Sequence, residues 1–314
     1  MKNIIHILNL IRYKNLLIII LTMYFMRLFI VTPLLNVIGL DPQFGHIDFA
    51  ILVMATVFIA AAGYAINDYF DRKVDMVNHP DSVVVGAKIP RRNAMTLNNT
   101  FNILAILAGF HVSHRIGHFN LGFLFVIISG ILWFYSSTYK KWFLVGNLIV
   151  ALFSAMVPFL VLLYEIPLLN LLPRLSESDN TIISLIFLYI SGYAFFAFFT
   201  TLAREIIKDI EDIEGDRAYG RKTLPVVTGV LASKIIVTLI IAVLIAAVTY
   251  ISWYFFGDLL SMGYSFILIT TPFIIVIFLL FRAKTNRDFR MTGNLMKAIM
   301  LAGLFYCVLI PFLI

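Results

Sequence analysis

The chain contains one cysteine among its 314 residues, and Cys307 lies in an apolar segment near the C-terminal end. Disulfides, zinc sites built from several cysteines and cysteine-ligated iron–sulfur clusters are therefore excluded within one chain. Charge is scarce as well, since only 13% of the residues are charged and 61% are hydrophobic. With a mean hydropathy of +0.96, this composition excludes an ordinary soluble domain and is typical of a polytopic membrane protein.

Apolar segments long enough to cross a bilayer occur along the whole sequence. A membrane-spanning helix needs about 20 apolar residues. Nine segments meet this length: 16–36, 48–66, 95–112, 119–138, 144–164, 182–203, 229–256, 258–281 and 293–314. The first is too long for the apolar part of a cleavable signal peptide, so we expect a membrane span there. The sequence therefore predicts an all-α bundle of nine transmembrane helices in a single domain, residues 1–314.

The net charge of +7 is distributed unevenly over the predicted ends and loops. If the N-terminus lies in the cytoplasm, the cytoplasmic side holds 21 of the 24 Lys and Arg residues. The outer loops, the longest of which is predicted at 165–181, hold only Arg115 and Arg174. This asymmetry follows the positive-inside rule and predicts an integral protein of the cell (inner) membrane with a cytoplasmic N-terminus. Nucleic acid is not needed to explain the basic charge, and no obligate protein partner is evident.

An acidic pattern occurs twice, each time where an apolar segment ends. The first copy comprises Asp68, Asp71 and Asp75, and the second comprises Asp209, Asp212 and Asp216. Both copies use offsets of zero, three and seven residues, which fall within an arc of roughly 60° on a helix. Each copy is therefore expected to present three carboxylates from one helical face. Two such faces brought together would bind hard cations such as Mg²⁺, whereas the alternative is two solvated helix ends.

The constant spacing of 141 residues between the two copies predicts an internal repeat. It relates the second, third and fourth predicted spans to the sixth, seventh and eighth. A shift of four spans returns the chain to the same side of the membrane, so the repeat is parallel. The expected repeats cover about 1–143 and 144–281, and the ninth helix, 293–314, has no counterpart. Both acidic faces are then expected on the cytoplasmic side.

Cationic and polar side chains accompany the two acidic copies. The loop that follows the first acidic copy and runs to about residue 94 is long, and we expect it to act as a lid over the site. Cations beside carboxylates suit a diphosphate, because metal ions bind some of its oxygens and cationic side chains bind the others. The candidate substrate-binding residues are Asn67, Arg72, Lys88, Arg91, Tyr139, Lys140, Lys141, Lys208, Arg221 and Lys222.

Two further features leave alternatives open. Arg27 lies within the first span, where it either faces an anionic ligand or makes a structural pair. His111, His114 and His118 could bind a metal on one helical face, but the default interpretation is that they are polar histidines at the membrane interface.

A carboxylate cage, nearby cations and an apolar body together favour a substrate with a diphosphate head and a hydrocarbon tail. The expected chemistry is ionisation of an allylic diphosphate and capture of the carbocation. Apolar and aromatic walls would hold the tail and exclude water.

At these residues the sequence resembles the UbiA superfamily of intramembrane prenyltransferases. The stretch NDYFDRKVD, residues 67–75, matches the first acidic motif of that family. Asp212 and Asp216 match the second, and the following stretch GRKTLP, residues 220–225, is also similar. The resemblance covers essentially the whole chain and implies a helical bundle around a central cavity. It also implies Mg²⁺-dependent transfer of a prenyl group from a prenyl diphosphate to an acceptor.

The resemblance also implies roles for single residues. Asn67, Asp71, Asp75, Asp212 and Asp216 would bind the Mg²⁺–diphosphate, and Asp68 and Asp209 would support them. The Tyr-x-x-x-Lys motif of the family is imperfect here, because Tyr135 and Lys140 are one residue too far apart. Tyr135, Tyr139, Lys140 and Lys141 therefore all remain candidates for its role.

The acceptor is open among several classes. The stretch from Arg204 to Val226 looks most like family members that prenylate geranylgeranylglyceryl phosphate in ether-lipid synthesis. Prenylation of an aromatic acceptor in quinone synthesis is the alternative within the family. A cation-coupled transporter is the alternative of another class, although no acidic residue lies in the middle of a predicted span. A phospholipid-alcohol phosphatidyltransferase is disfavoured, because its continuous acidic motif is missing.

Overall fold

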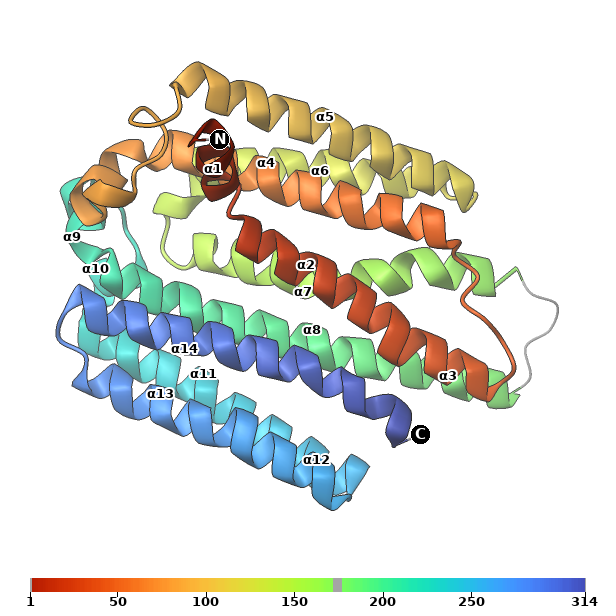
Figure 1. Ribbon diagram of the computed structural model, residues 1–314. Coiled ribbons are helices and arrows are strands. Elements are labelled where there is room, and N and C mark those ends of the chain that lie inside the picture. The colour runs from red at the N-terminus through yellow and green to blue at the C-terminus, as the bar shows by residue number, and fades with distance from the viewer. Residues whose placement is uncertain (1, 172–176, 314) are drawn as a thin grey trace.

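A computed structural model describes residues 2–171 and 177–313, and its long elements are all helices (Figure 1). The α-helices are α1 (Lys2–Leu10), α2 (Tyr13–Met26), α3 (Thr32–Val37), α4 (His46–Asn78), α5 (Arg91–Arg115), α6 (Phe123–Ser137), α7 (Val145–Leu169), α8 (Glu177–Glu211), α9 (Ile213–Ala218), α10 (Leu224–Thr228), α11 (Val230–Ile251), α12 (Leu259–Tyr264), α13 (Thr271–Arg282) and α14 (Asn286–Phe305). Short 3₁₀ or π turns extend or connect them: η1 (Arg27–Val31), η2 (Pro80–Ser82), η3 (Phe119–Gly122), η4 (Tyr139–Lys141), η5 (Ser252–Phe256), η6 (Ser265–Thr270) and η7 (Tyr306–Phe312). The all-α prediction is confirmed.

Within the described residues, eight helical stretches are long and apolar enough to cross a membrane. They correspond to eight of the nine predicted segments. The predicted segment 95–112 lies within α5, which is 25 residues long but opens with a polar sequence, RRNAMTLNN. The count of nine spans therefore stays a prediction. The predicted turn between the seventh and eighth segments is present at Gly257 and Asp258, and the Asp258 side chain caps α12.

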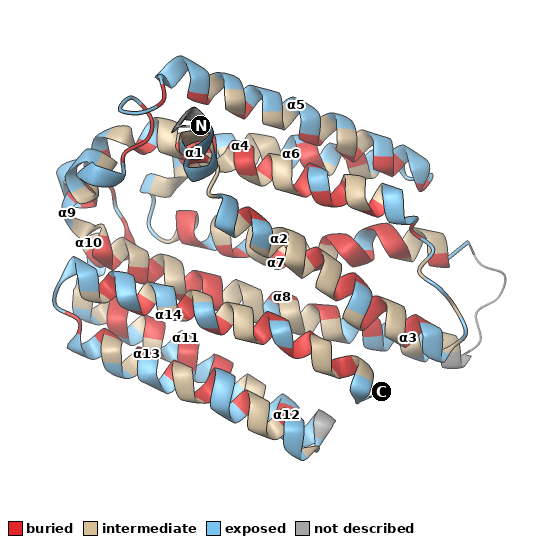
Figure 2. Ribbon diagram, viewed as in Figure 1, coloured by how far each residue is buried: buried red, intermediate tan, exposed pale blue. Residues whose placement is uncertain are grey.

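Exposed residues occur along the long helices (Figure 2), and many of them are large and apolar. Leu231 and Leu239 on α11 and Phe266 on η6 are each more than 60% exposed. Water would make so much exposed apolar surface unfavourable, whereas the hydrocarbon core of a bilayer accommodates it. The chain is therefore an integral membrane protein.

Two apolar clusters hold the bundle together. The larger one forms mainly among α2 to α7 and includes Met26, Phe125 and Tyr164. The second forms mainly among α8, α11, α13 and α14 and includes Ile241 and Phe273. These clusters do not test the proposed repeat boundaries, which stay a prediction.

Two charged residues, Arg27 and Glu165, are buried at one end of the bundle. Arg27 donates a hydrogen bond to the carbonyl oxygen of Phe44 and stacks on Phe49. Glu165 accepts hydrogen bonds from the backbone amides of Gln43 and Phe44. Of the two roles considered for Arg27, these contacts favour the structural pair.

Helix extends into both of the loops that the sequence predicted. At the end with Arg27, α7 reaches Leu169 and α8 begins at Glu177, so the predicted outer loop 165–181 is largely helical. Pro173 and Arg174 lie outside the described residues. At the opposite end, α4 continues to Asn78, so the connection to α5 is shorter than predicted.

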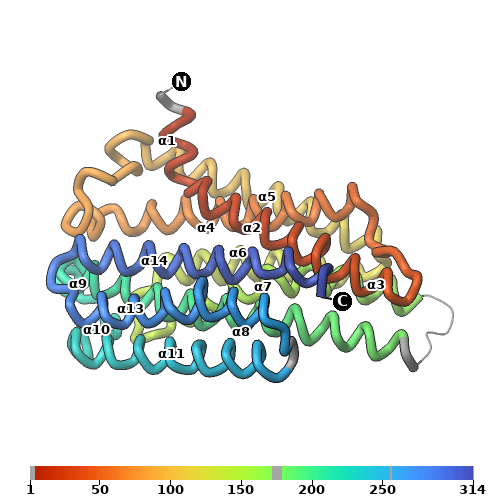
Figure 3. Tube along the Cα trace, turned by 60° about the horizontal axis from the view of Figure 1, so that its bottom comes forward, coloured from red at the N-terminus to blue at the C-terminus, as the bar shows by residue number. Residues whose placement is uncertain are grey.

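All residues of the two acidic motifs belong to one end of the bundle, here called the acidic end. Helices α1, α9 and α10 also lie there, and the described chain finishes towards the other end (Figures 1 and 3). A segment from His79 to Pro90 follows α4, with Gly86 in the left-handed region at φ +81°.

Candidate active site

The first acidic motif lies on a single helix, as the spacing predicted. Asn67, Asp68, Asp71 and Asp75 all belong to α4. Asn67 and Asp71 are buried, whereas Asp68 and Asp75 are half-buried. Arg12, at the junction of α1 and α2, pairs with Asp68 at 3.0 Å and lies over the ring of Tyr64.

The second acidic motif is divided by a break in the helix, and the prediction of one continuous helical face was wrong here. Asp209 belongs to α8, which ends at Glu211. Asp212 adopts φ −93° and ψ 7° as the N-cap residue of α9, and Asp216 lies within α9. The break separates Asp209 from the other two: its carboxylate accepts a hydrogen bond of 2.8 Å from Asn147 on α7.

A cavity of about 360 Å³ lies between the two motifs and is here called the motif cavity. It is lined by Asn9, Arg12, Asn67, Asp68, Asp71, Val74, Asp75, Asn78, His79, Ser82, Val84, Lys88, Lys140, Lys208, Asp212, Asp216 and Arg221. Five of these residues are aspartates and five are lysines or arginines. The cavity therefore combines groups that bind cations with groups that bind anionic oxygens.

Asp71 is the centre of the ion pairs in the motif cavity. It accepts hydrogen bonds from both Lys140 and Arg221. Lys140 also donates to the Asn67 side chain at 3.0 Å, and Arg221 to Asp216 at 3.3 Å. Arg221 thus connects the aspartates of both motifs.

Burial and charge act in opposite directions on these groups. Burial disfavours the ammonium of Lys140, but the charge and hydrogen bond of Asp71, together with Tyr135, outweigh burial and raise the pKa of Lys140. Burial raises the pKa of Asp216, and the nearby charge of Arg221 offsets only part of this effect. Lys140 is therefore held as a cation beside the aspartates.

Asn78 and His79 connect the end of α4 to the second motif. The Asn78 amide donates to the carbonyl oxygen of Asp212 at 3.0 Å and accepts from the backbone amide of Gly215 at 2.8 Å. Nε2 of His79 lies 2.7 Å from Oδ1 of Asp212. Arg290 on α14 donates to Nδ1 of the same ring at 2.9 Å. Arginine can only donate, so neutral His79 carries its proton on Nε2 and donates to Asp212.

The structure brings most of the sequence-predicted residues into the motif cavity. Those that line it are Asn67, Asp68, Asp71, Asp75, Lys88, Lys140, Lys208, Asp212, Asp216 and Arg221. Those that do not line it are Arg72, Arg91, Tyr135, Tyr139, Lys141, Asp209 and Lys222.

Other contacts account for the residues outside the motif cavity. Arg72 lies against Gly86, and Arg91 stacks on Tyr69. Tyr139 packs on the ring of Trp142. The side chains of Lys141 and Lys222 are exposed, while the Lys222 amide donates to the Lys141 carbonyl at 2.9 Å. Among the candidates for the Tyr-x-x-x-Lys role, Lys140 is the one that lines the cavity.

Sequence reasoning missed Arg12, Asn78 and His79 as site residues. A signal for His79 was present, because it follows Asp75 by four residues and so lies one helical turn further on. Asn78 carried a comparable signal, because it follows Asp75 by three residues. Arg12 carried none, since its partner Asp68 is distant in the sequence.

The aspartates and Asn67 offer oxygen ligands of the kind that Mg²⁺ prefers. Asn67, Asp71, Asp75, Asp212 and Asp216 all line the motif cavity, so the donor chemistry fits this ion. In the described part of the chain, however, no three His, Cys, Asp or Glu side chains are grouped closely enough to hold a metal. In this arrangement Lys140 and Arg221 contact the carboxylate of Asp71, and His79 contacts that of Asp212. The exposed histidines 111, 114 and 118 form no metal group either.

Comparison with known proteins identifies the family. Residues 28–301 match the model of the UbiA prenyltransferase family. The chain belongs to the UbiA prenyltransferase family. This membership confirms the predicted family and the predicted class of enzyme, a membrane prenyltransferase, and leaves the transporter alternative without support.

Relatives and solved structures agree with the family assignment. The digeranylgeranylglyceryl phosphate synthase of Methanothermobacter thermautotrophicus is 33% identical over 219 residues, which are 68% of this chain and 67% of that protein. A match to another protein of the same name, from Methanobrevibacter smithii, covers 60% of its length.

Two solved structures share the fold of this UbiA family member. One, from a study of digeranylgeranylglyceryl phosphate synthase in membranes, has a TM-score of 0.63 at 22% identity and covers 99% of both chains. The other is a UbiA homolog from Archaeoglobus fulgidus bound to DMAPP and Mg²⁺, with a TM-score of 0.54 at 16% identity, covering 96% of this chain and 98% of that one.

Proposed function

We propose that this protein transfers a prenyl group, with Mg²⁺, from a prenyl diphosphate to geranylgeranylglyceryl phosphate, forming the second ether bond of an archaeal-type lipid. The observation that carries the proposal is the motif cavity, which is lined by five aspartates and five cationic side chains. The names of the most similar curated proteins support the glyceryl phosphate acceptor. Mg²⁺ in the structure of the Archaeoglobus homolog supports the choice of metal.

In this proposal, cations of the motif cavity bind the diphosphate. Lys88, Lys140 and Arg221 provide donors for its oxygens. Asn67, Asp71, Asp75, Asp212 and Asp216 would hold Mg²⁺, with Asp68 supporting them from the same cavity. Bound Mg²⁺ supplies neutralisation of the negative charge on the leaving diphosphate. Asp209 acts from outside the cavity by orienting the end of α8 through Asn147.

The reaction exchanges one carbon–oxygen bond for another. The bond between C1 of the prenyl group and the diphosphate breaks, and its electron pair stays on the diphosphate oxygen. A lone pair of the acceptor hydroxyl then forms the new ether bond, and the hydroxyl proton passes to the released diphosphate. The half-buried Lys140 and the buried Arg221 stabilise the charge that develops on the leaving group.

The orientation in the membrane forms part of the proposal. The excess of Lys and Arg on the predicted inner ends supports a cytoplasmic N-terminus and a cytoplasmic acidic end. The water-soluble diphosphate product would then be released into the cytoplasm of the cell.

A direct test uses the purified full chain in vesicles. Mg²⁺ and prenyl diphosphates of several lengths are supplied with either geranylgeranylglyceryl phosphate or a panel of aromatic acids, and products are analysed by mass spectrometry. We expect the diether phosphate, and we expect none of it when the metal is chelated. Prenylation of an aromatic acid alone would reject the lipid acceptor, and no transfer to any acceptor would reject the proposed reaction.

A further inference from the structure

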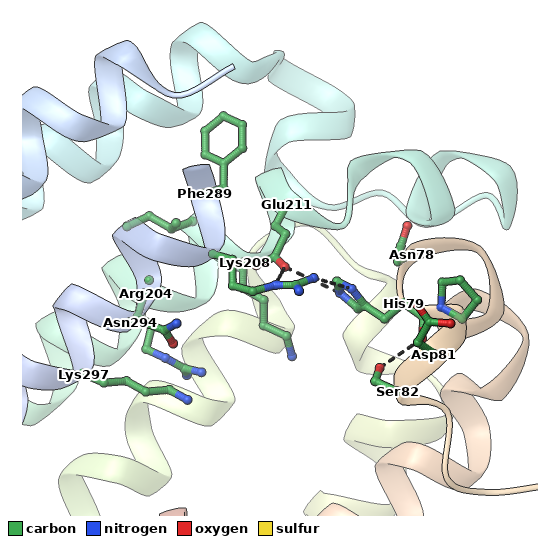
Figure 4. A pocket seen from close by; sticks show the side chains of 14 residues that line it. Asn78, His79, Asp81, Ser82, Arg204, Lys208, Glu211, Phe289, Asn294 and Lys297 are labelled. Carbon is green, nitrogen blue, oxygen red and sulfur yellow. Dashed lines mark hydrogen bonds and ion pairs between the residues drawn. The ribbon is translucent and has the colours of Figure 1, made fainter. Parts of the chain in front are cut away.

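A second cavity, of about 420 Å³, lies beside the motif cavity (Figure 4). It is bounded by α8, by the first turns of α14 and by the segment that follows α4. Asn78, His79, Ser82 and Lys208 line both cavities, so the two are in direct contact. No sequence pattern drew attention to this second cavity.

Positive charge exceeds negative charge in the second cavity. Arg204, Lys208, Arg290 and Lys297 line it, together with the acidic residues Asp81 and Glu211. Two of the cations already have carboxylate partners. Arg204 pairs with the neighbouring Glu205 at 2.5 Å, and Arg290 pairs with Glu211 at 2.8 Å.

The two lysines have no such partners. Among the described residues, neither Lys208 nor Lys297 makes an ion pair or a side-chain hydrogen bond. Both extend towards the same open space from two different helices, α8 and α14 (Figure 4). Lys297 is half-buried and lies within the electrostatic reach of Arg204 and Lys208, and also of the carboxylate of Glu205. Glu205 already pairs with Arg204, so the ammonium groups of Lys208 and Lys297 add positive charge that a bound anion would offset.

The charges of the two cavities therefore differ. The motif cavity balances aspartates against cations, which suits a diphosphate that arrives with a metal. The second cavity has few carboxylates and two unpaired ammonium groups, which suits an anion without a metal. A phosphate monoester carries between one and two negative charges near neutral pH and matches these two ammonium groups.

We infer that the second cavity binds the phosphate of the acceptor, with Lys297 and Lys208 as its cationic contacts and Asn294 as a polar contact at the rim. The inference rests on the proposed function, because it assumes a glyceryl phosphate acceptor. In such an acceptor, only two carbons and one oxygen separate the free hydroxyl oxygen from the phosphorus. The acceptor phosphate must therefore bind directly beside the site where the prenyl diphosphate reacts, and the second cavity occupies that position.

Of the two lysines, Lys297 can test the second cavity separately, because Lys208 lines both cavities and Lys297 lines only the second one. In Lys297→Met we expect the KM for geranylgeranylglyceryl phosphate to rise about 10-fold or more, since a charge-assisted contact is lost. The Kd for an unreactive prenyl diphosphate analogue should stay within about twofold, because that ligand binds in the other cavity. Lys297→Arg keeps the charge and should restore most of the acceptor affinity.

Lys284→Met provides the matched control. Lys284 is exposed in the turn between α13 and α14 and lines neither cavity. The Lys284→Met substitution should leave the acceptor KM and the Kd of the prenyl diphosphate analogue unchanged. Geranylgeranylglycerol, which lacks the phosphate, provides a second control: wild type and Lys297→Met should use it equally poorly.

The outcomes separate failure of the inference from failure of the proposed function. If wild type forms the diether but Lys297→Met leaves the acceptor KM unchanged, the phosphate binds elsewhere and the inference is rejected. If wild type prenylates only another class of acceptor, the proposed function fails first. A lipid headgroup in this cavity would make the effect of Lys297→Met depend on anionic lipid in the vesicles, with an unchanged acceptor KM, and this result would also overturn the inference.

Discussion

Nε2 of His79 lies 2.7 Å from Oδ1 of Asp212, and this contact joins the end of α4 to the start of α9. The two residues are 133 positions apart in the sequence. The contact matters because α4 carries the first acidic motif and α9 carries part of the second. A titratable group thus helps to hold the two halves of the site together.

The first prediction concerns the pH dependence of this contact. The hydrogen bond with Asp212 raises the pKa of His79 above its ordinary value of 6.5, against the effect of burial. A raised pKa in the folded state stabilises the fold fully below pH 6.5, and the stabilisation is lost as the pH rises through the folded-state value. The difference in Tm between wild type and His79→Gln should therefore be larger at about pH 6 than at about pH 9.

The measurement is thermal unfolding of the metal-free protein in detergent at both pH values. Asp212 does not titrate in this range, because its pKa is lowered. Burial raises this pKa, but the hydrogen bond with His79 and the charge of Lys208 nearby outweigh burial. Its carboxylate is therefore charged throughout this range. A Tm difference that does not change with pH would show that the contact contributes nothing through protonation.

The second prediction concerns Asp71, which accepts from Lys140 and Arg221 and is 2% exposed. Asp71→Asn should lower the single-turnover rate of prenyl transfer by about 100-fold or more, comparable to the loss of one preorganised transition-state contact. Asp41→Asn changes an exposed aspartate at the other end of the bundle and should leave the rate unchanged. Near-normal rates in a correctly folded Asp71→Asn protein would remove this residue from the mechanism.

Several features of the site could be predicted because they depend on local periodicity. The apolar segments predicted the long helices. The offsets of Asp68, Asp71 and Asp75 predicted one acidic helical face, and these three residues lie on α4. The break at Asp212 could not be predicted from the same offsets. It is held by contacts of Asn78 with residues more than 130 positions away, and no local pattern encodes them.

Helix α5 illustrates a second limit of sequence reasoning. Its polar first half conflicts with a simple count of apolar residues, but part of this polarity is satisfied inside the bundle. Asn102 donates to Asn98 at 3.1 Å and accepts from Ser129 on α6 at 2.8 Å. Hydropathy alone does not register such pairing, because it treats each side chain as if it were isolated.

The third prediction compares Arg221 and Lys222, two neighbouring cations that were both predicted from the sequence to bind substrate. Arg221 is buried between Asp71 and Asp216, whereas Lys222 is exposed. Arg221→Gln should raise the Kd for an unreactive prenyl diphosphate analogue about 10- to 100-fold, the range expected for a buried charge-assisted hydrogen bond. Lys222→Gln should change it by about threefold at most, because exposed charges interact weakly.

Titration calorimetry of both variants with the same analogue and Mg²⁺ provides the comparison. A larger effect at Lys222 than at Arg221 would mean that the diphosphate binds outside the motif cavity.

The fourth prediction concerns Asn78, which bridges α4 and α9 through the carbonyl of Asp212 and the amide of Gly215. Asn78→Ala leaves both groups without this partner and should cost about 1–3 kcal/mol of stability. The loss should be local, so hydrogen exchange should become faster in Ile213–Ala218 before the rest of the bundle is affected. Asn93→Ala, which alters an exposed asparagine on α5, should leave exchange in that segment unchanged.

Gly215 tests the same bridge from the other side. A Cβ at this position would lie 2.6 Å from the amide nitrogen of Asn78, so Gly215→Ala should displace that side chain. Once Asn78 is already alanine, the added methyl group has nothing to displace. Gly215→Ala should therefore accelerate exchange in α9 strongly in the wild-type background and only slightly in Asn78→Ala, since the two changes act on one contact. Equal acceleration in both backgrounds would show that Gly215 acts independently of the bridge.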